Sequence, residues 1–189
     1  MNNKECLGSW IRRFLMEYMV GERNLSSNTQ ISYRDALILL LPFASKAAHQ
    51  MIDELSIEHL SENIIRNFLQ YLEKDRGCSP STRNQRLAAI HALARFIALR
   101  CPEQVLWSSK ICQIPFKKTL KSSLDYLEKD EMDALLDAPQ RHKKLGFRDY
   151  TLLLFLYNTG ARAQEAADVK IPDLNLTTAA SVKIIGKGN

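Results

Sequence analysis

The residue pattern in this chain that is best suited to chemistry is the stretch Asn158 to Ala166, in which an arginine follows a glycine turn. An apolar helix is expected to end at Gly160, and Arg162 then opens the next helix. An arginine in this place can offer two parallel hydrogen bonds to a phosphate, beside the N–H groups at a helix start. The alternative is an ordinary ion pair with Glu165, three positions later.

Other familiar catalytic patterns are missing from the sequence. It has no G-x-S-x-G, P-loop or H-E-x-x-H pattern. Its four cysteines form no C-x-x-C pair and therefore predict reduced thiols rather than a zinc site. The histidines are scattered, so we expect neither a metal ion nor a cofactor. These cysteines and histidines are Cys6, Cys78, Cys101, Cys112, His49, His59, His91 and His142.

Positive charge is concentrated in the middle of the chain. The net charge of the 189 residues is +5, but residues 76–121 hold nine basic residues and one acidic residue. A block of this kind is expected of a protein that binds a phosphate backbone. A solvated helix face followed by a basic linker would give the same pattern, so the charge by itself leaves both interpretations open.

The composition is that of a globular protein, with 46% hydrophobic and 25% charged residues. No run of about 18 uncharged apolar residues occurs, which excludes a membrane span. Charged residues between Lys4 and Glu17 argue against a signal peptide. We therefore expect a cytoplasmic protein that has no membrane partner.

Hydrophobic spacing predicts four helices within residues 1–102, and short connections between them predict a small bundle. The fourth helix has the clearest beginning, because Ser79 can cap it and Pro80 suits its first position. Pro42 is expected to kink or end the second helix, and Gly21 is expected to lie past the end of the first. The expected helices cover residues 7–18, 28–41, 62–73 and 80–100.

A second unit is expected after a linker. Residues 103–124 show no clear period and carry Pro115 with several lysines and serines, which predicts a basic linker. Within residues 125–189, short helices are expected at 127–136, 150–157 and 163–168. The middle one is apolar nearly all round, so it is expected to be buried. Val182 to Ile185 predict a strand, with a hairpin turn at 186–189 and no returning strand.

These motifs give the chain a resemblance to the tyrosine recombinase (phage integrase) family, most closely to its Xer-like members. The family's first catalytic arginine lies in a T-G-x-R-x-x-E block, which is 159–165 here. Its catalytic lysine often lies in a G-K-G-N hairpin, which is 186–189 here, with Lys187 standing 25 positions after Arg162. The family's helical motifs N-T-x-x-x-Y and S-x-x-T-x-N-x-R-L also occur, from Asn28 and from Ser79.

The resemblance implies a fold that is mainly α. It consists of a four-helix, SAM-like core-binding bundle and the truncated start of a mixed α/β recombinase catalytic domain. The implied activity is site-specific DNA strand exchange without a cofactor, in which a tyrosine attacks a phosphodiester. Arg162 would bind the scissile phosphate with support from Glu165, and Lys187 would protonate the leaving 5′ oxygen. The implied partner is double-stranded DNA, with self-association on DNA, as in family tetramers, if the protein is full-length.

In the family, the second and fourth bundle helices face the duplex, and the linker helps two domains to encircle it. Arg83 and Arg86 lie near the apolar side of the fourth helix, so we expect them to project past the end of the bundle. Most contacts are expected to go to phosphates, which position a protein without reading sequence. The implied DNA contacts are Thr29, Tyr33, Arg34, Arg83, Asn84, Arg86, His91, Arg95, Lys117, Lys118 and Lys121.

The sequence departs from the family pattern beyond Lys187. The family's H-x-x-R block and nucleophilic tyrosine should follow that lysine, whereas all six tyrosines of this chain precede it. The chain is therefore expected to be an N-terminal part of a recombinase that cannot cleave DNA alone. The alternatives are a catalytically dead DNA-binding protein derived from a recombinase and a helical protein-interaction module.

Overall fold

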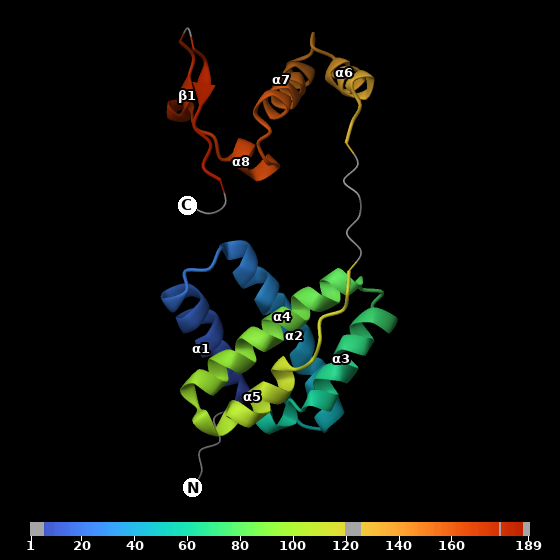
Figure 1. Cartoon of the computed structure of the whole chain (residues 1–189), viewed down its shortest axis with the longest axis vertical. Helices are drawn as coiled ribbons and strands as arrows, with labels where there is room; N and C mark the ends of the chain where they lie inside the picture. The colour runs from blue at the N-terminus through green and yellow to red at the C-terminus, as the bar shows by residue number, and fades with distance from the viewer. Residues whose placement is uncertain (1–5, 120–125, 178, 187–189) are drawn as a thin grey trace. The chain divides into compact units, whose positions relative to one another are not determined.

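The structure is a computed structural model that describes residues 6–119, 126–177 and 179–186. The chain divides into two compact units, Met1–Lys121 and Ser122–Asn189 (Figure 1). Helices dominate both units, which confirms the prediction that the fold is mainly α. In the described ranges, no helix combines the length and the apolar character that a membrane span requires.

The first unit is a helical bundle. Gly21 lies inside its first helical segment rather than past the end, because a π-helix continues α1 without a break and buries Phe14 and Met19. Short 3-10 turns join several of the other helices. The segments are α1 Leu7–Arg13, the π-helix Phe14–Glu22, α2 Ser27–Ala48, 3-10 turns Ile52–Glu54 and Ile57–His59, α3 Glu62–Lys74, α4 Pro80–Arg100, a 3-10 turn Pro102–Gln104 and α5 Val105–Cys112.

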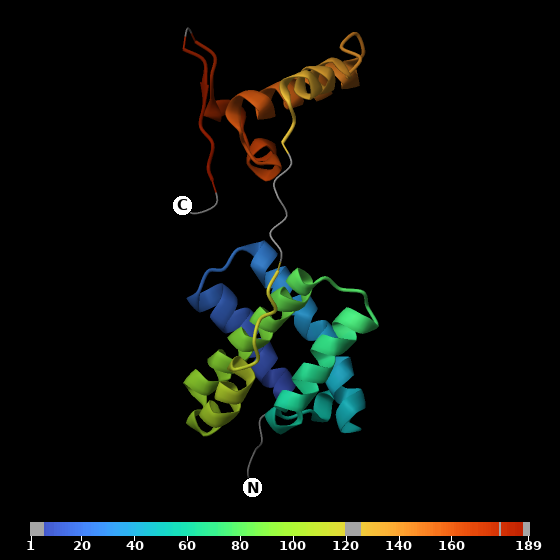
Figure 2. The same cartoon turned by 45° about the vertical axis from the view of Figure 1, so that its right-hand side comes forward.

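Helix α4 runs through the middle of the bundle in both views (Figures 1 and 2). It begins as predicted, with Pro80 as its first residue and the Ser79 hydroxyl accepting a hydrogen bond from the Thr82 N–H at 3.2 Å. It packs against α2, α3 and α5, so that Leu93 and Phe96 are fully enclosed. The central helix therefore supplies much of the apolar core.

Pro42 does not end α2, contrary to one of the two predicted outcomes. The helix continues for six residues beyond it, to Ala48. A proline inside a helix removes one backbone hydrogen bond. Burial of Leu40 before the proline and of Ala44 after it holds both halves of α2 against the same core.

The predicted linker over 103–124 is wrong in its first half, because helix α5 occupies part of it. Ile111 on α5 and Ile114 just after it are completely or almost completely buried against the bundle. The Trp107 indole Nε1 also donates a hydrogen bond to the carbonyl oxygen of Leu60 at 2.7 Å. The sequence does not reveal this helix because it has only eight residues and no amphipathic pattern: Val105 and Leu106 are exposed, whereas Ser108 is buried.

The second unit contains three α-helices and a small antiparallel ribbon among its described residues. The helix predicted to be buried, at 150–157, lies in α7 and has no buried residue. Leu152 and Tyr157 are exposed because the described elements around α7 are short and cover only part of it. The elements are α6 Lys129–Asp137, α7 Lys144–Thr159, α8 Ala163–Ala167, a 3-10 turn Ile171–Asp173, β1 Leu174–Asn175 and β2 Ser181–Val182.

The ribbon is shorter than the predicted strand and has a partner that the sequence did not suggest. β2 is Ser181–Val182, so it shares only Val182 with the predicted strand, and it pairs with β1 so that Leu174 faces Val182. The rest of the predicted strand, Lys183 to Ile185, forms no ladder. Of the expected turn at 186–189, residues 187–189 lie outside the described residues.

We predict that Ile111→Ala destabilises the first unit by about 2–5 kcal/mol, because it opens a cavity in a filled core. The measurement is urea unfolding of the full chain followed by tryptophan fluorescence. Leu106→Ala is the matched control, since Leu106 lies on the same helix and is 78% exposed. Equal, small effects of both variants would mean that α5 is not part of the core.

Candidate nucleic-acid interface and phosphate site

The turn before Arg162 is fixed by local backbone geometry. α7 ends at Gly160, whose φ of 63° is the left-handed conformation that glycine adopts without strain. The Thr159 hydroxyl donates to the Phe155 carbonyl at 2.7 Å and accepts from the Ala161 N–H at 3.2 Å. Arg162 is then the N-cap residue of α8, as the sequence predicts.

The Arg162 guanidinium makes the ion pair that the sequence offered as an alternative. Its Nη1 lies 2.7 Å from Oε1 of Glu165, and the Arg162 backbone N–H donates to Oε2 at 2.9 Å. The arginine side chain is 76% exposed and that of Glu165 is 13% exposed. The carboxylate therefore orients the guanidinium from one side and leaves its other side open to an anion.

The chain just before Lys187 lies close to the Glu165 carboxylate. A β-carbon placed on Gly186 would lie 3.6 Å from Oε1 of Glu165. Ile185 and Glu165 also line one cavity of about 570 Å³ beside α8. Lys187 itself lies outside the described residues, so its position relative to Arg162 stays a prediction.

On the bundle, the beginnings of α2 and α4 lie side by side. The Gln85 side-chain amide donates to the Ser32 hydroxyl at 2.7 Å, which joins the two helices. Of the predicted contacts here, Arg34 is exposed and Thr29 and Tyr33 are half-buried. Gln85 was not predicted, although its place between Asn84 and Arg86 in the fourth-helix motif could have drawn attention to it.

Arg83 does not project past the end of the bundle. It is 6% exposed, and its Nη1 donates to the Pro115 carbonyl at 2.9 Å. Asn84 next to it binds both backbone groups of Lys117, donating to the carbonyl at 2.7 Å and accepting from the N–H at 2.9 Å. These residues hold residues 113–117, which we call the exit segment, against α4.

His91 is also enclosed, contrary to the prediction that it faces DNA. It is 3% exposed, and its ring meets the edge of Phe116 with centroids 5.2 Å apart. Burial lowers the pKa of His91 below its usual value, and the nearby charges of Arg95 and Arg83 lower it further. The histidine is therefore a neutral packing residue under the exit segment.

The side chains of the remaining predicted DNA contacts differ in their exposure and in their partners. Arg95 is exposed and Arg86 is half-buried, with its Nη1 3.0 Å from the Cys78 thiol. The Lys117 ammonium is paired with Glu73 at 2.7 Å. Lys118 is exposed, and Lys121 lies outside the described residues.

Comparison with known sequences identifies the family. The family described as "Phage integrase, N-terminal SAM-like domain" matches residues 11–100, and the "Phage integrase family" matches residues 125–189. The chain belongs to the phage integrase family of tyrosine recombinases. The two matches correspond to the helical bundle and to the unit that carries Arg162.

Individual family members resemble the chain over nearly its whole length. Proteins y4rC and y4rD of Sinorhizobium fredii are 34% and 38% identical to it, over 100% and 96% of the chain. A tyrosine recombinase XerD of Staphylococcus saprophyticus is 33% identical over 92% of the chain. The chain spans 57%, 64% and 56% of the lengths of these three relatives.

A solved structure has a similar fold. The XerH site-specific recombinase, in a post-cleavage complex with a palindromic difH substrate, aligns with a TM-score of 0.62. The alignment covers 88% of this chain and 48% of the XerH chain at 24% identity. This likeness supports the arrangement of helices described above.

We predict that Asn84→Ala loosens the exit segment, because it removes two hydrogen bonds to Lys117. Trypsin cleavage after Lys117 and Lys118, followed by mass spectrometry, should become about tenfold faster. Asn67→Ala, an exposed position on α3, is the matched control. An unchanged cleavage rate for Asn84→Ala would show that other contacts hold the segment.

We predict that His91 makes the bundle less stable in mild acid. Since its pKa is lowered in the folded state, the unfolded chain takes up the proton more readily, and stability falls as the pH drops below the usual histidine pKa of about 6.5. The urea midpoint should decrease more between about pH 8 and pH 5.5 for the native chain than for His91→Phe. His142→Phe, at an exposed position, should behave like the native chain.

Proposed function

We propose that this chain carries the DNA-binding bundle and part of the catalytic machinery of a site-specific tyrosine recombinase. The observation that carries the proposal is family membership over both units, with the family's arginine block at the turn into α8. The related XerH protein was solved with a DNA substrate, which supports duplex DNA as the partner here. Self-association on that DNA is part of the proposal.

The proposed DNA contacts follow from exposure. We infer that the beginnings of α2 and α4 and the exposed side of α4 approach the phosphate backbone. Arg83, Asn84 and His91 are not included, because they hold the exit segment. The proposed contacts with exposed or half-buried side chains are Thr29, Tyr33, Arg34, Gln85, Arg86, Arg95 and Lys118. Lys121, which lies outside the described residues, is proposed from the sequence alone.

The proposed chemistry is phosphoryl transfer to a tyrosine. A tyrosine oxygen would form a bond to phosphorus while the bond to the 5′ oxygen breaks, and that oxygen would take its proton from Lys187. Arg162, held by Glu165, would stabilise the negative charge that develops on the phosphoryl oxygens. No cofactor is needed, since the covalent bond conserves the energy for rejoining.

A second candidate is a DNA-binding protein that occupies recombination sites without cleaving them. Such a protein would use the same exposed basic side chains of the bundle, such as Arg95 and Lys118, without chemistry at Arg162. We propose that residues 1–189 do not cleave DNA by themselves. Incubation with a nicked duplex followed by denaturing electrophoresis tests this, and a covalent protein–DNA band would contradict it.

We predict that Arg95→Gln weakens binding to a mixed-sequence duplex in a gel-shift assay, because it removes a phosphate contact. The slope of log affinity against log salt should decrease by about 0.9. Arg66→Gln, at an exposed arginine on α3, is the matched control and should leave the slope unchanged. Affinity that stays flat between about 50 and 200 mM salt would exclude the proposed backbone contacts.

A further inference from the structure

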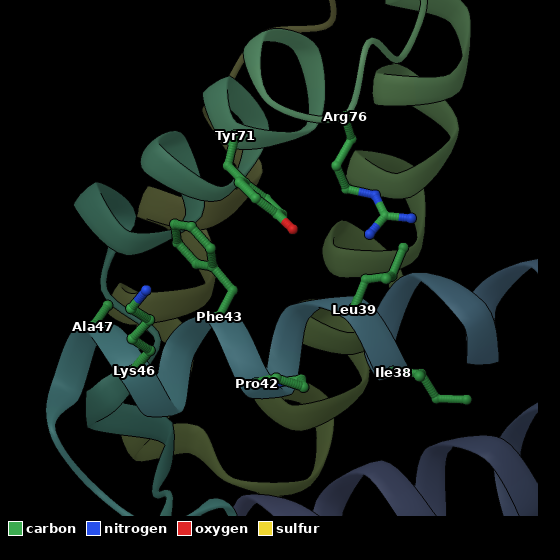
Figure 3. Close-up of a pocket in the computed structure, with 8 residues that line it drawn as sticks. All are labelled: Ile38, Leu39, Pro42, Phe43, Lys46, Ala47, Tyr71 and Arg76. Carbon is green, nitrogen blue, oxygen red and sulfur yellow. The ribbon is translucent and has the colours of Figure 1, made fainter.

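A groove on the outer side of α2 and α3 takes no part in the proposed DNA contacts. It has a volume of about 650 Å³. Figure 3 shows α2 along one side of it, with Tyr71 of α3 and Arg76 of the following loop on the other. The residues that matter for its chemistry are Ile38, Pro42, Phe43, Lys46, Tyr71 and Arg76.

The floor of the groove is apolar and well supported. The rings of Phe43 and Tyr71 pack with centroids 5.3 Å apart, and Phe43 also packs on the buried Phe68 with centroids 5.5 Å apart. Ile38 stands at the rim and is 56% exposed, which leaves a large apolar side chain in water. The groove is thus an extension of the core that would gain from being covered.

Pro42 adds a hydrogen-bond acceptor to this surface. It has no N–H, so the carbonyl of Ile38, four residues earlier, lacks the helical donor that another residue would supply. Ile38 and Pro42 both line the groove, so we expect this acceptor to lie near its edge. A donor on a bound molecule can satisfy it.

Two cations border the groove and have no counter-charge. Among the described residues, neither Lys46 nor Arg76 has an ion pair or a side-chain hydrogen bond, and no carboxylate lines the groove. Arg66 on α3, by contrast, holds Glu62 at 2.7 Å. In Figure 3, Lys46 lies on the Phe43 side of the ring pair and Arg76 on the Tyr71 side.

We propose that this groove is a docking site for an acidic amphipathic helix of a partner protein. Apolar side chains of that helix would cover Ile38 and the Phe43–Tyr71 pair, and carboxylates near its ends would meet Lys46 and Arg76. From Ile38 to Lys46, α2 is about 12 Å long, which suits about two turns of a bound helix. Duplex DNA would supply negative charge but no side chains to cover the apolar floor.

The test uses the full chain and a fluorescent helical peptide of about 15 residues, with leucines on one face and glutamates flanking that face. A peptide with lysines in place of the glutamates is the matched probe. Fluorescence anisotropy should show binding of the acidic peptide at least tenfold tighter than that of the basic one. Equal affinities for the two peptides would overturn the proposal.

Variants of the chain test whether the peptide binds in this groove. Ile38→Asp should weaken the acidic peptide about tenfold, whereas Ile31→Asp, at an exposed position on the same helix that does not line the groove, should not. The double variant Lys46→Glu with Arg76→Glu should invert the preference between the two peptides. Circular dichroism of each variant confirms that the bundle is folded, and equal effects of Ile38→Asp and Ile31→Asp would overturn the proposal.

Further measurements distinguish two other occupants of the groove, which are duplex DNA and a second copy of the chain. If the double variant loses as much DNA affinity as Arg95→Gln, the two cations serve phosphates and the docking proposal is wrong. If the chain forms a dimer in sedimentation and Ile38→Asp abolishes it, the groove joins two copies and the proposal is also wrong. Unchanged DNA binding and an unchanged sedimentation profile, together with peptide binding, support it independently of whether the DNA contacts are correct.

Discussion

The first unit depends on the packing of α4 between its neighbouring helices. This helix buries apolar residues against α2, α3 and α5, so its rotation about its own axis is fixed. Because the rotation is fixed, the direction of every polar side chain on it is fixed as well. Arg95 is directed to solvent, whereas Arg83 and His91 are directed under the exit segment.

This constraint divides the basic block into two functional groups. Arg83 is a structural cation, and burial lowers its pKa while the carboxylate of Glu73 opposes that shift. Its guanidinium binds a backbone carbonyl of the exit segment, so this cation is used within the protein itself. A count of basic residues therefore overstates the positive charge that the bundle exposes to solvent, whereas Arg95 and Lys118 are exposed.

In the second unit, the main structural feature is that the exposed guanidinium of Arg162 is held in a fixed direction. The left-handed Gly160 ends α7, the Thr159 hydroxyl closes the turn and Glu165 holds Arg162 from one side. All of these contacts are local in sequence. The direction of the arginine therefore follows mainly from residues 159–165, and the chain at Gly186 also lies close to the Glu165 carboxylate.

Features that arise from local chemistry could be predicted from the amino-acid sequence alone. The start of α4 at Ser79 and Pro80, the stop of α7 at Gly160 and the place of Arg162 at the head of α8 all follow from capping and turn preferences between near neighbours. The family motifs could be read in the same way. The spacing of the motif residues is a property of the sequence and does not depend on how the helices pack.

Features that depend on residues far apart in the chain could not be predicted and became apparent only in the folded structure. The burial of Arg83 and His91 requires the exit segment, more than twenty residues later, to lie over α4. Helix α5 was not predicted because it is short and is stabilised by contacts of Trp107 and Ile111 with the bundle rather than by a periodic apolar face of its own. Pro42 stays within α2 because burial on both sides outweighs one missing hydrogen bond.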